Sequence, residues 1–269
     1  MTIKMKEILD VTYRIVDGNN LKLDIFLPDN VESPPLIFWV HGGAWMMGDR
    51  KWCGMKNQID RGYAVVSVDY RLSTVAPFPA CIEDCKYALA FLRENANKYP
   101  IDLTRICAAG DSAGGHLVAL MGTSAGHEDW EPVGADCSVQ AVIDLYGPTL
   151  TRPSIPIEEG EPPVLSTLLG SPIYSPKGRM TAAAASPLTY IDGTEPPFLI
   201  IHGDCDDIVH IKQSYALRDA LEEHETDVIM YTVLSGGHGF ECPTVDAVID
   251  GFLDYVFKGI KPKTPEWAE

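Results

Sequence analysis

Short apolar runs, separated by turns rich in glycine and proline, dominate the pattern of hydrophobic and polar positions along this chain. Two alternating stretches, residues 11–16 and 21–27, flank a polar turn and predict an antiparallel hairpin. The run at 36–40 is apolar at every position, which indicates a strand covered on both faces of a sheet. Further strands are expected at residues 63–68, 105–109, 140–145, 198–201 and 228–234.

Between these strands, apolar residues recur at three- and four-residue steps, as they do on one face of an α-helix. Helices are expected after Phe78, after Ser112, and at 212–223 and 244–257. Strands that alternate with helices predict an α/β fold, with a mostly parallel, doubly wound sheet covered on both faces. We find no internal repeat and no domain boundary, so residues 1–269 are interpreted as a single domain.

The pattern changes between Pro148 and Pro197, a stretch that holds ten of the 20 prolines and shows little sustained periodicity. Within it, residues 162–169 and 180–185 could each form one or two helical turns. A stretch this long with few regular elements is usually a functional insertion rather than a connection. We therefore expect a small cap or lid over residues 148–190.

Charge and composition exclude several classes of function. The chain has 38 acidic and 21 basic residues and a net charge of −17, which disfavours binding to nucleic acid or to anionic membranes. The apolar runs are too short to span a bilayer, and residues 1–10 lack the apolar core of a secretory signal. Its seven cysteines are an odd set without a CxxC pair, as expected for free thiols. Together these features predict a cytoplasmic protein.

The strongest chemical signal is the pentapeptide Gly-Asp-Ser-Ala-Gly at residues 110–114, which lies between a predicted strand and a predicted helix. A G-x-S-x-G turn in this context holds its serine in a strained conformation with the hydroxyl exposed, and the flanking glycines avoid collisions with neighbouring backbone. Ser112 is therefore the candidate nucleophile. The alternative is a glycine-rich turn with an idle serine.

A serine nucleophile needs a base and an acid that orients the base. His238 is the candidate base, because it directly follows the last predicted strand and has glycines on both sides that leave its imidazole free to project. Asp206, four residues after His202, is the preferred acid, and Asp207 is the alternative. His116 lies on the helix after the serine and is expected to point away from the turn.

Donors for a developing oxyanion are expected from backbone amides, which need close approach to the substrate. We predict the amides of Gly43 and Ala44, in the turn that follows the first buried strand, and that of Ala113. The alternative is a glycine turn that only ends the strand. Trp45 is expected either to line the substrate cleft or to pack in the interior, and Asp111 to contact substrate.

Several segments together resemble known esterases, and the order Ser, Asp, His along the chain is that of an α/β-hydrolase. Those similar to the hormone-sensitive-lipase-like esterases are His-Gly-Gly-Ala-Trp at 41–45, Asp-Tyr-Arg-Leu at 69–72, Phe-Pro-Ala at 78–80 with Asp84, and Gly-Asp-Ser-Ala-Gly-Gly at 110–115. Those more similar to the small bacterial esterases related to feruloyl esterases are Ser-Pro at 186–187 and Gly-His-Gly-Phe at 237–240.

The resemblance implies an α/β-hydrolase fold and hydrolysis of carboxylic esters through an acyl-enzyme on Ser112. Short-chain acyl esters are the expected small-molecule substrates, including acetyl or feruloyl esters of plant polysaccharides, and neither a metal nor an organic cofactor is expected. The chain departs from the family pattern at Ala44, where the third glycine of His-Gly-Gly-Gly is usual. It also lacks a large amino-terminal helical cap, so residues 148–190 are expected to shape the alcohol side.

Two other functions are compatible with the sequence. Residues 202–210 are also similar to the acid loop of the prolyl-oligopeptidase family, and His-Gly-Gly-x-Trp is also found in kynurenine formamidases, so a peptide or small-amide hydrolase is the nearest alternative. A binding protein with a hydrolase fold and no catalysis is the other. The sequence leaves the acyl chain length, the natural alcohol and the oligomeric state open.

Overall fold

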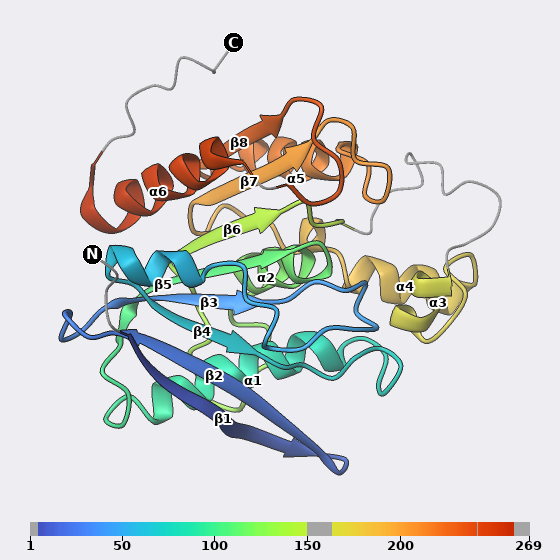
Figure 1. Cartoon of the computed structure of the whole chain (residues 1–269). Coiled ribbons are helices and arrows are strands. Elements are labelled where there is room, and N and C mark those ends of the chain that lie inside the picture. Colours follow the sequence, from blue (N-terminus) through green and yellow to red (C-terminus); the bar gives the residue numbers. More distant parts are fainter. Residues whose placement is uncertain (1–4, 150–162, 241, 261–269) are drawn as a thin grey trace.

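The computed structural model describes residues 5–149, 163–240 and 242–260, and its centre is one eight-stranded sheet (Figure 1). The strand order is β1-β2-β4-β3-β5-β6-β7-β8. Strands β3 to β8 are parallel, while β2 pairs antiparallel with both β1 and β4, which confirms the predicted hairpin and parallel sheet. The strands are β1 (Met5–Val16), β2 (Asn19–Pro28), β3 (Pro35–Val40), β4 (Ala64–Val68), β5 (Asp102–Asp111), β6 (Ala141–Leu145), β7 (Phe198–Gly203) and β8 (Val228–Val233).

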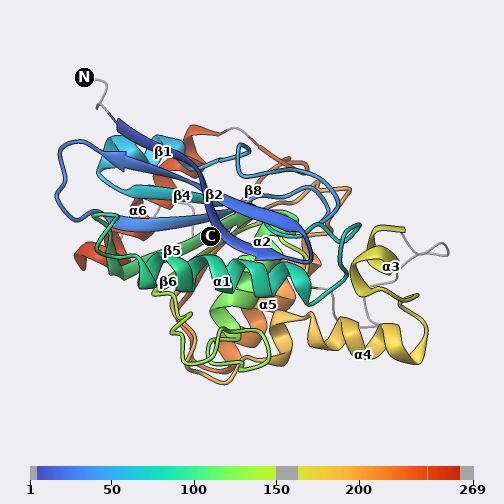
Figure 2. The same ribbon diagram turned by 90° about the horizontal axis from the view of Figure 1, so that it is seen from below.

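Helices cover both faces of the sheet. Helices α1, α2 and α5 lie on one face, and α6 lies on the other with the short helix η1, as the view in Figure 2 shows. The helices are η1 (Lys56–Arg61), α1 (Ala80–Glu94), α2 (Ala113–Thr123), α3 (Pro163–Leu169), α4 (Pro176–Ala184), η2 (Pro187–Thr189), α5 (Lys212–Glu223) and α6 (Pro243–Lys258).

Strand β3 shows why the central runs are apolar at every position. Leu36 and Phe38 lie in the core that α1, α2 and α5 cover, whereas Ile37 and Trp39 lie in the core beneath α6. All four side chains are buried. Successive strand residues face opposite sides of a sheet, so a strand with helices on both sides needs apolar residues at every position.

Helices α3 and α4 lie beyond the carboxyl ends of the central strands (Figure 1), within the predicted cap. Helix α4 begins earlier than the expected 180–185, because Ser175 caps it: the Ser175 hydroxyl accepts the backbone N–H of Gly178 at 2.9 Å, and Pro176 occupies the first helical position. Residues 150–162, the first part of the predicted cap, lie outside the described residues.

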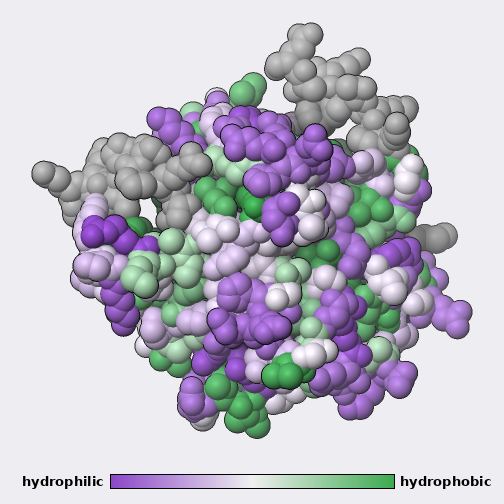
Figure 3. All heavy atoms as spheres, turned by 180° about the vertical axis from the view of Figure 1, so that it is seen from behind, coloured by the Kyte–Doolittle hydropathy of each residue, from purple (hydrophilic) through white to green (hydrophobic). Residues whose placement is uncertain are grey.

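The surface and the cysteines agree with the composition. On the face drawn in Figure 3, hydrophobic residues occur in small groups between hydrophilic ones. All seven cysteines are free thiols, and Cys81 and Cys85 are buried on the packed face of α1, as their one-turn spacing suggests. Within the described parts of the chain, no helix has both the length and the apolar character needed to cross a membrane.

Candidate active site

The predicted site residues lie on loops that leave the carboxyl ends of strands β3, β5, β7 and β8. These ends meet at one edge of a parallel sheet, where open α/β folds bind their ligands. There the structure brings together Ser112, His238 and Asp206. The Nε2 atom of His238 lies 3.0 Å from Ser112 Oγ, and its Nδ1 atom lies 2.8 Å from Asp206 Oδ2.

Ser112 occupies a strained turn between β5 and α2. Its φ of 51° and ψ of −116° are unfavourable for a residue with a side chain, and its backbone N–H donates to the carbonyl of Leu145 at 2.8 Å. A Cβ atom on Gly114 would lie 2.0 Å from the carbonyl oxygen of Val40, and one on Gly110 would lie 2.6 Å from the backbone of Gly114. The glycines therefore allow the close packing of strand and helix that this turn requires.

Asp206 is held from both carboxylate oxygens. Its Oδ1 atom accepts the backbone N–H groups of Ile208 at 2.9 Å and Val209 at 2.8 Å, and its Oδ2 atom contacts His238. Burial alone would raise the pKa of Asp206, but the hydrogen bonds from His238 and from the two amides outweigh it, and the pKa is lowered. The alternative acid, Asp207, is exposed, so the geometry favours Asp206.

The imidazole of His238 packs against Tyr146, a residue to which the sequence analysis assigned no role. The ring centroids are 4.9 Å apart, with an angle of 65° between the rings. Tyr146 follows β6 with a φ of 46°, and its backbone N–H donates to the carbonyl of Ile201 at 2.8 Å. Its place at a strand end was the only signal in the sequence that could have identified it.

The turn after β3 leaves backbone amides unused beside the serine. The amide of Gly42 donates to Asp111 Oδ1 at 2.9 Å, while those of Gly43, Ala44 and Ala113 donate to no acceptor among the described residues. Gly43 has a φ of 105° and Ala44 one of 53°, a left-handed turn. The structure thus places Asp111, expected to contact substrate, against the turn that carries the predicted oxyanion donors.

Trp45 was expected either to line the cleft or to pack in the interior, and its contacts are those of packing. It is buried, and its Nε1–H donates to Nδ1 of His116 at 3.1 Å. His116 is fully buried and donates from Nε2 to the carbonyl of Ala185 at 2.7 Å. Burial lowers the pKa of His116 to about 4, which keeps its imidazole neutral. His116 thus links the turn after β3 to the end of the cap helices.

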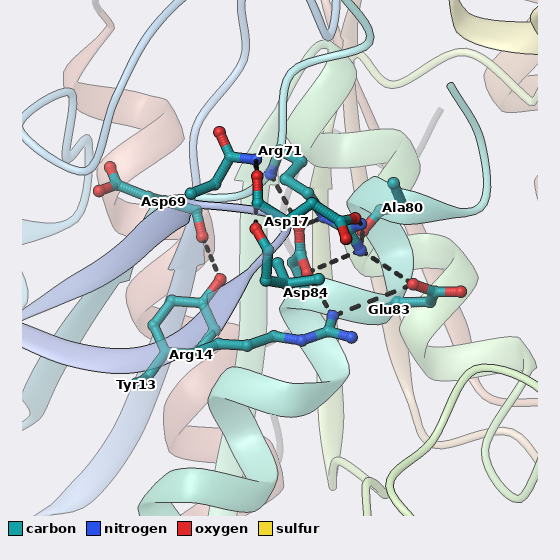
Figure 4. Close-up of polar contacts among 10 residues, drawn as sticks. Tyr13, Arg14, Asp17, Asp69, Arg71, Ala80, Glu83 and Asp84 are labelled. Carbon is teal, nitrogen blue, oxygen red and sulfur yellow. Dashed lines mark hydrogen bonds and ion pairs between the residues drawn. The ribbon is translucent and has the colours of Figure 1, made fainter. Parts of the chain in front are cut away.

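A second loop supports the same turn from outside. The backbone N–H of Ser73 donates to the carbonyl of Trp45 at 2.7 Å. Two residues before it, Arg71 contacts the fully buried carboxylate of Asp84 on α1 at 2.7 Å, and Arg14 of β1 contacts the same carboxylate (Figure 4). The ion pair between Arg71 and Asp84 therefore fixes residues 69–73 to α1, and Ser73 in turn holds the turn after β3. The Asp-Tyr-Arg-Leu segment and Asp84 were both noted in the sequence.

The contacts from carboxylate to imidazole to hydroxyl form an arrangement that can activate a serine as a nucleophile. The acid orients the imidazole, the imidazole faces the hydroxyl, and unused backbone amides lie in the neighbouring turn and at the start of α2. Considering only the described residues, no group of three or more His, Cys, Asp or Glu side chains is arranged to hold a metal ion.

Comparisons with known proteins identify a matching family and relatives that are named esterases. The BD-FAE family model matches residues 23–221. Esterase LipC of Mycobacterium tuberculosis is 32% identical over 215 residues, which cover 77% of this chain and 53% of LipC. Esterase LipQ of the same organism is 32% identical over 209 residues, which cover 76% of this chain and 49% of LipQ. The chain therefore spans about half the length of these curated relatives.

Solved structures cover the chain more completely. A truncated form of a carbohydrate esterase from gut microbiota superposes with a TM-score of 0.80 at 27% identity and covers 92% of this chain and 95% of its own. A Bacteroides eggerthii protein described as a bifunctional GH43-CE gives a TM-score of 0.84 at 31% identity over 93% of this chain and 38% of its own. These likenesses confirm the predicted α/β-hydrolase fold.

Proposed function

The chain belongs to the BD-FAE family, and from this premise we propose that it is a serine carboxylesterase that hydrolyses short-chain acyl esters. One observation carries the proposal: His238 lies between Ser112 and Asp206, at 3.0 and 2.8 Å from their side-chain oxygens. Those relatives that are named esterases support the reaction type. In this reading, three residues from three loops form a Ser-His-Asp triad.

In the first half of the reaction, His238 Nε2 removes the proton of Ser112 Oγ while that oxygen attacks the ester carbonyl. Asp206 accepts the N–H at Nδ1, which selects the tautomer whose Nε2 has a free lone pair and stabilises the imidazolium that forms. The carbonyl oxygen becomes an oxyanion, and the amides of Gly43, Ala44 and Ala113 bind it.

The imidazolium then gives its proton to the departing alcohol, which completes the first half and leaves an acyl-enzyme on Ser112. The second half is the hydrolysis of this acyl-enzyme. A water molecule then gives its proton to His238 and attacks the acyl carbonyl, where the same amides stabilise the second oxyanion. The carboxylic acid leaves and Ser112 regains its proton. Both halves use the chain's own side chains and amides.

We infer that the acyl group is short and that the natural alcohol belongs to a carbohydrate. Ala44 has a methyl group at the turn position where the family pattern has glycine, and we infer that this methyl group narrows the space on the acyl side. The carbohydrate esterase from gut microbiota, whose truncated form this chain covers almost end to end, supports a carbohydrate as the alcohol. Acetyl esters of plant polysaccharides combine both features, whereas feruloyl esters share the carbohydrate alcohol but carry a larger acyl group.

A panel of p-nitrophenyl esters from acetate to decanoate tests the reaction, with the Ser112→Ala protein as control. We expect turnover that falls beyond butyrate or hexanoate and that the control lacks. Release of acetate or ferulate from esterified xylan oligosaccharides then tests whether the natural alcohol is a carbohydrate. No Ser112-dependent turnover at any chain length would overturn the proposal, and faster cleavage of the matching anilide or formanilide would favour an amide hydrolase.

A further inference from the structure

A second imidazole, which the proposed reaction does not use directly, contacts the acid of the site. His202 is the next-to-last residue of β7 and is fully buried. Its Nε2 atom lies 3.1 Å from Asp206 Oδ2 and 2.7 Å from the carbonyl oxygen of Val209. Its Nδ1 atom lies 2.6 Å from the hydroxyl of Ser214 on α5. His202 therefore links α5 to the loop that carries Asp206.

These contacts determine the protonation of His202. Both partners of Nε2, a carboxylate and a carbonyl, are acceptors, so Nε2 carries the hydrogen. Burial lowers the pKa of His202 and keeps the ring neutral, so Nδ1 has a free lone pair. The buried hydroxyl of Ser214 then donates to Nδ1, and this bond selects the tautomer that faces Asp206.

With this tautomer, both oxygens of Asp206 receive two N–H donors. Oδ1 accepts the amides of Ile208 and Val209, and Oδ2 accepts His238 and shares the Nε2–H of His202 with the carbonyl of Val209. The carboxylate is held in one plane, with Oδ2 aimed at His238. We propose that His202 is a positioning residue, which fixes the Asp206 carboxylate and so the orientation of His238 toward Ser112. The inference rests on the proposed triad.

Simple packing does not account for the arrangement. An apolar side chain of similar size would fill the same volume, but it would leave Val209 O and one lone pair of Asp206 without their donor. The contacts also run in series from α5 to α2, through Ser214, His202, Asp206, His238 and Ser112. A change at His202 is thus separated from the Ser112 hydroxyl by three hydrogen bonds in series.

His202→Asn and His202→Gln form a matched pair that tests the inference. Both amides are neutral, but the asparagine amide ends near the Nδ1 position and keeps only the partner for Ser214. The glutamine amide reaches the Nε2 position and restores a donor toward Asp206. Because a misaligned catalytic group costs up to about 100-fold in rate, we expect His202→Asn to lower kcat about 10- to 100-fold with KM unchanged, and His202→Gln to recover most of the loss.

Two readouts separate positioning from a merely structural role. Each kcat is expressed per active serine, titrated with a fluorophosphonate, so a misfolded fraction does not count. The low-field NMR signal of the proton between His238 and Asp206 should shift or broaden in His202→Asn and return in His202→Gln. Wild-type values of both kcat and this signal in His202→Asn would overturn the inference, as would equal losses in the two variants.

The two proposals fail in different ways. If the unmodified protein hydrolyses no ester, the proposed function fails, but the low-field signal still shows whether His202 orders the contact between His238 and Asp206. If the protein is an esterase and the signal does not respond to the matched pair, only the role of His202 fails.

Discussion

The two glycine-rich loops of the site, residues 41–48 after β3 and 235–240 after β8, look alike in sequence but contain glycine for different reasons. In the first loop, a Cβ atom on Gly43 would lie 2.3 Å from the carbonyl oxygen of Met47, and one on Gly48 would lie 2.5 Å from His41 Nδ1. In the second loop, a Cβ atom on Gly236 would lie 2.9 Å from the Val233 side chain, but one on Gly237 or Gly239, on either side of His238, would meet nothing within 4 Å.

The difference follows from what each loop supplies. In the proposed reaction, the loop after β3 supplies main-chain amides, so its backbone must already have the correct conformation before substrate binds. The loop after β8 supplies one side chain, and contacts with Asp206 and Tyr146 place that side chain. One loop is preorganised by its own backbone, and the other by partners on neighbouring strands.

Each loop also depends on a carboxylate, and the two carboxylates have opposite pKa shifts. Burial raises the pKa of Asp111, which receives the amide of Gly42. Burial has the same sign at Asp206, but the donors from His238 and the backbone reverse it. Asp206 is therefore held as the anion that an imidazolium needs beside it, whereas the charge of Asp111 is poorly compensated.

Asp206→Asn should have the largest effect, because it breaks the contact that places His238. An asparagine amide in this position favours the wrong imidazole tautomer, and the corresponding change in a Ser-His-Asp triad costs about 10⁴-fold in kcat. We expect a loss of this order in ester hydrolysis, with circular dichroism and substrate KM close to those of the unmodified protein. A loss below about tenfold would assign the acid role to another carboxylate, and Asp207→Asn is the matched control.

Gly43→Ala should have the second-largest effect on kcat, because it distorts the backbone of the loop after β3. The new Cβ atom would meet Met47 O at 2.3 Å, and the residue would have to keep a φ of 105°. Displacing one oxyanion donor costs about 100- to 1000-fold in kcat, and we expect this loss together with a lower unfolding temperature. Steady-state kinetics and thermal unfolding measure both, and an active, stable Gly43→Ala protein would contradict the difference between the loops.

Asp111→Asn should have a smaller effect on activity and a pH-dependent effect on stability. The asparagine oxygen can still accept the Gly42 amide. The substitution removes the attraction between the Asp111 carboxylate and a positively charged His238. An interaction between partly exposed charges is worth about 1 kcal/mol or less, so we expect kcat to change by at most about fivefold.

The sign of the stability effect follows from the raised pKa of Asp111. Between the unfolded pKa of about 3.9 and its folded pKa, Asp111 binds more protons in the folded state, so its contribution to stability is lost as pH rises through that window. Asparagine does not titrate. From about pH 4 upward, the free energy of unfolding of Asp111→Asn should therefore increase relative to that of the unmodified protein, as urea unfolding can measure. A constant difference across this range would contradict the assignment.

The fold was predictable because its signals are local. Apolar runs, helical periodicity and turn residues lie within a few positions of one another, so most strands and helices fall near their expected ranges, although β1 begins six residues before the expected residue 11. The beginning of α4 was missed, since Ser175 and Pro176 set it within a region of weak periodicity.

The site was predictable only in part, for the same reason. Ser112, Asp206 and His238 stand at strand ends with distinctive neighbours, so their residue types and order suggested contacts that the structure brings together. The roles of His202 and Asp111 depend on partners that only the folded sheet supplies. Asp111 meets Gly42 because β3 lies beside β5, a pairing that no local pattern encodes.

Gly237→Ala should have the smallest effect, and an effect of opposite sign on stability. Gly237 does not have a positive φ, and its added Cβ atom would meet nothing within 4 Å, so alanine fits the native conformation. Such a change reduces the freedom of the unfolded chain and stabilises a protein by about 0.4–1 kcal/mol. We expect urea unfolding to show this gain, with kcat for a p-nitrophenyl ester unchanged. A large loss of kcat would mean that the backbone beside His238 is as constrained as the turn at Gly43, and that the two loops contain glycine for the same reason.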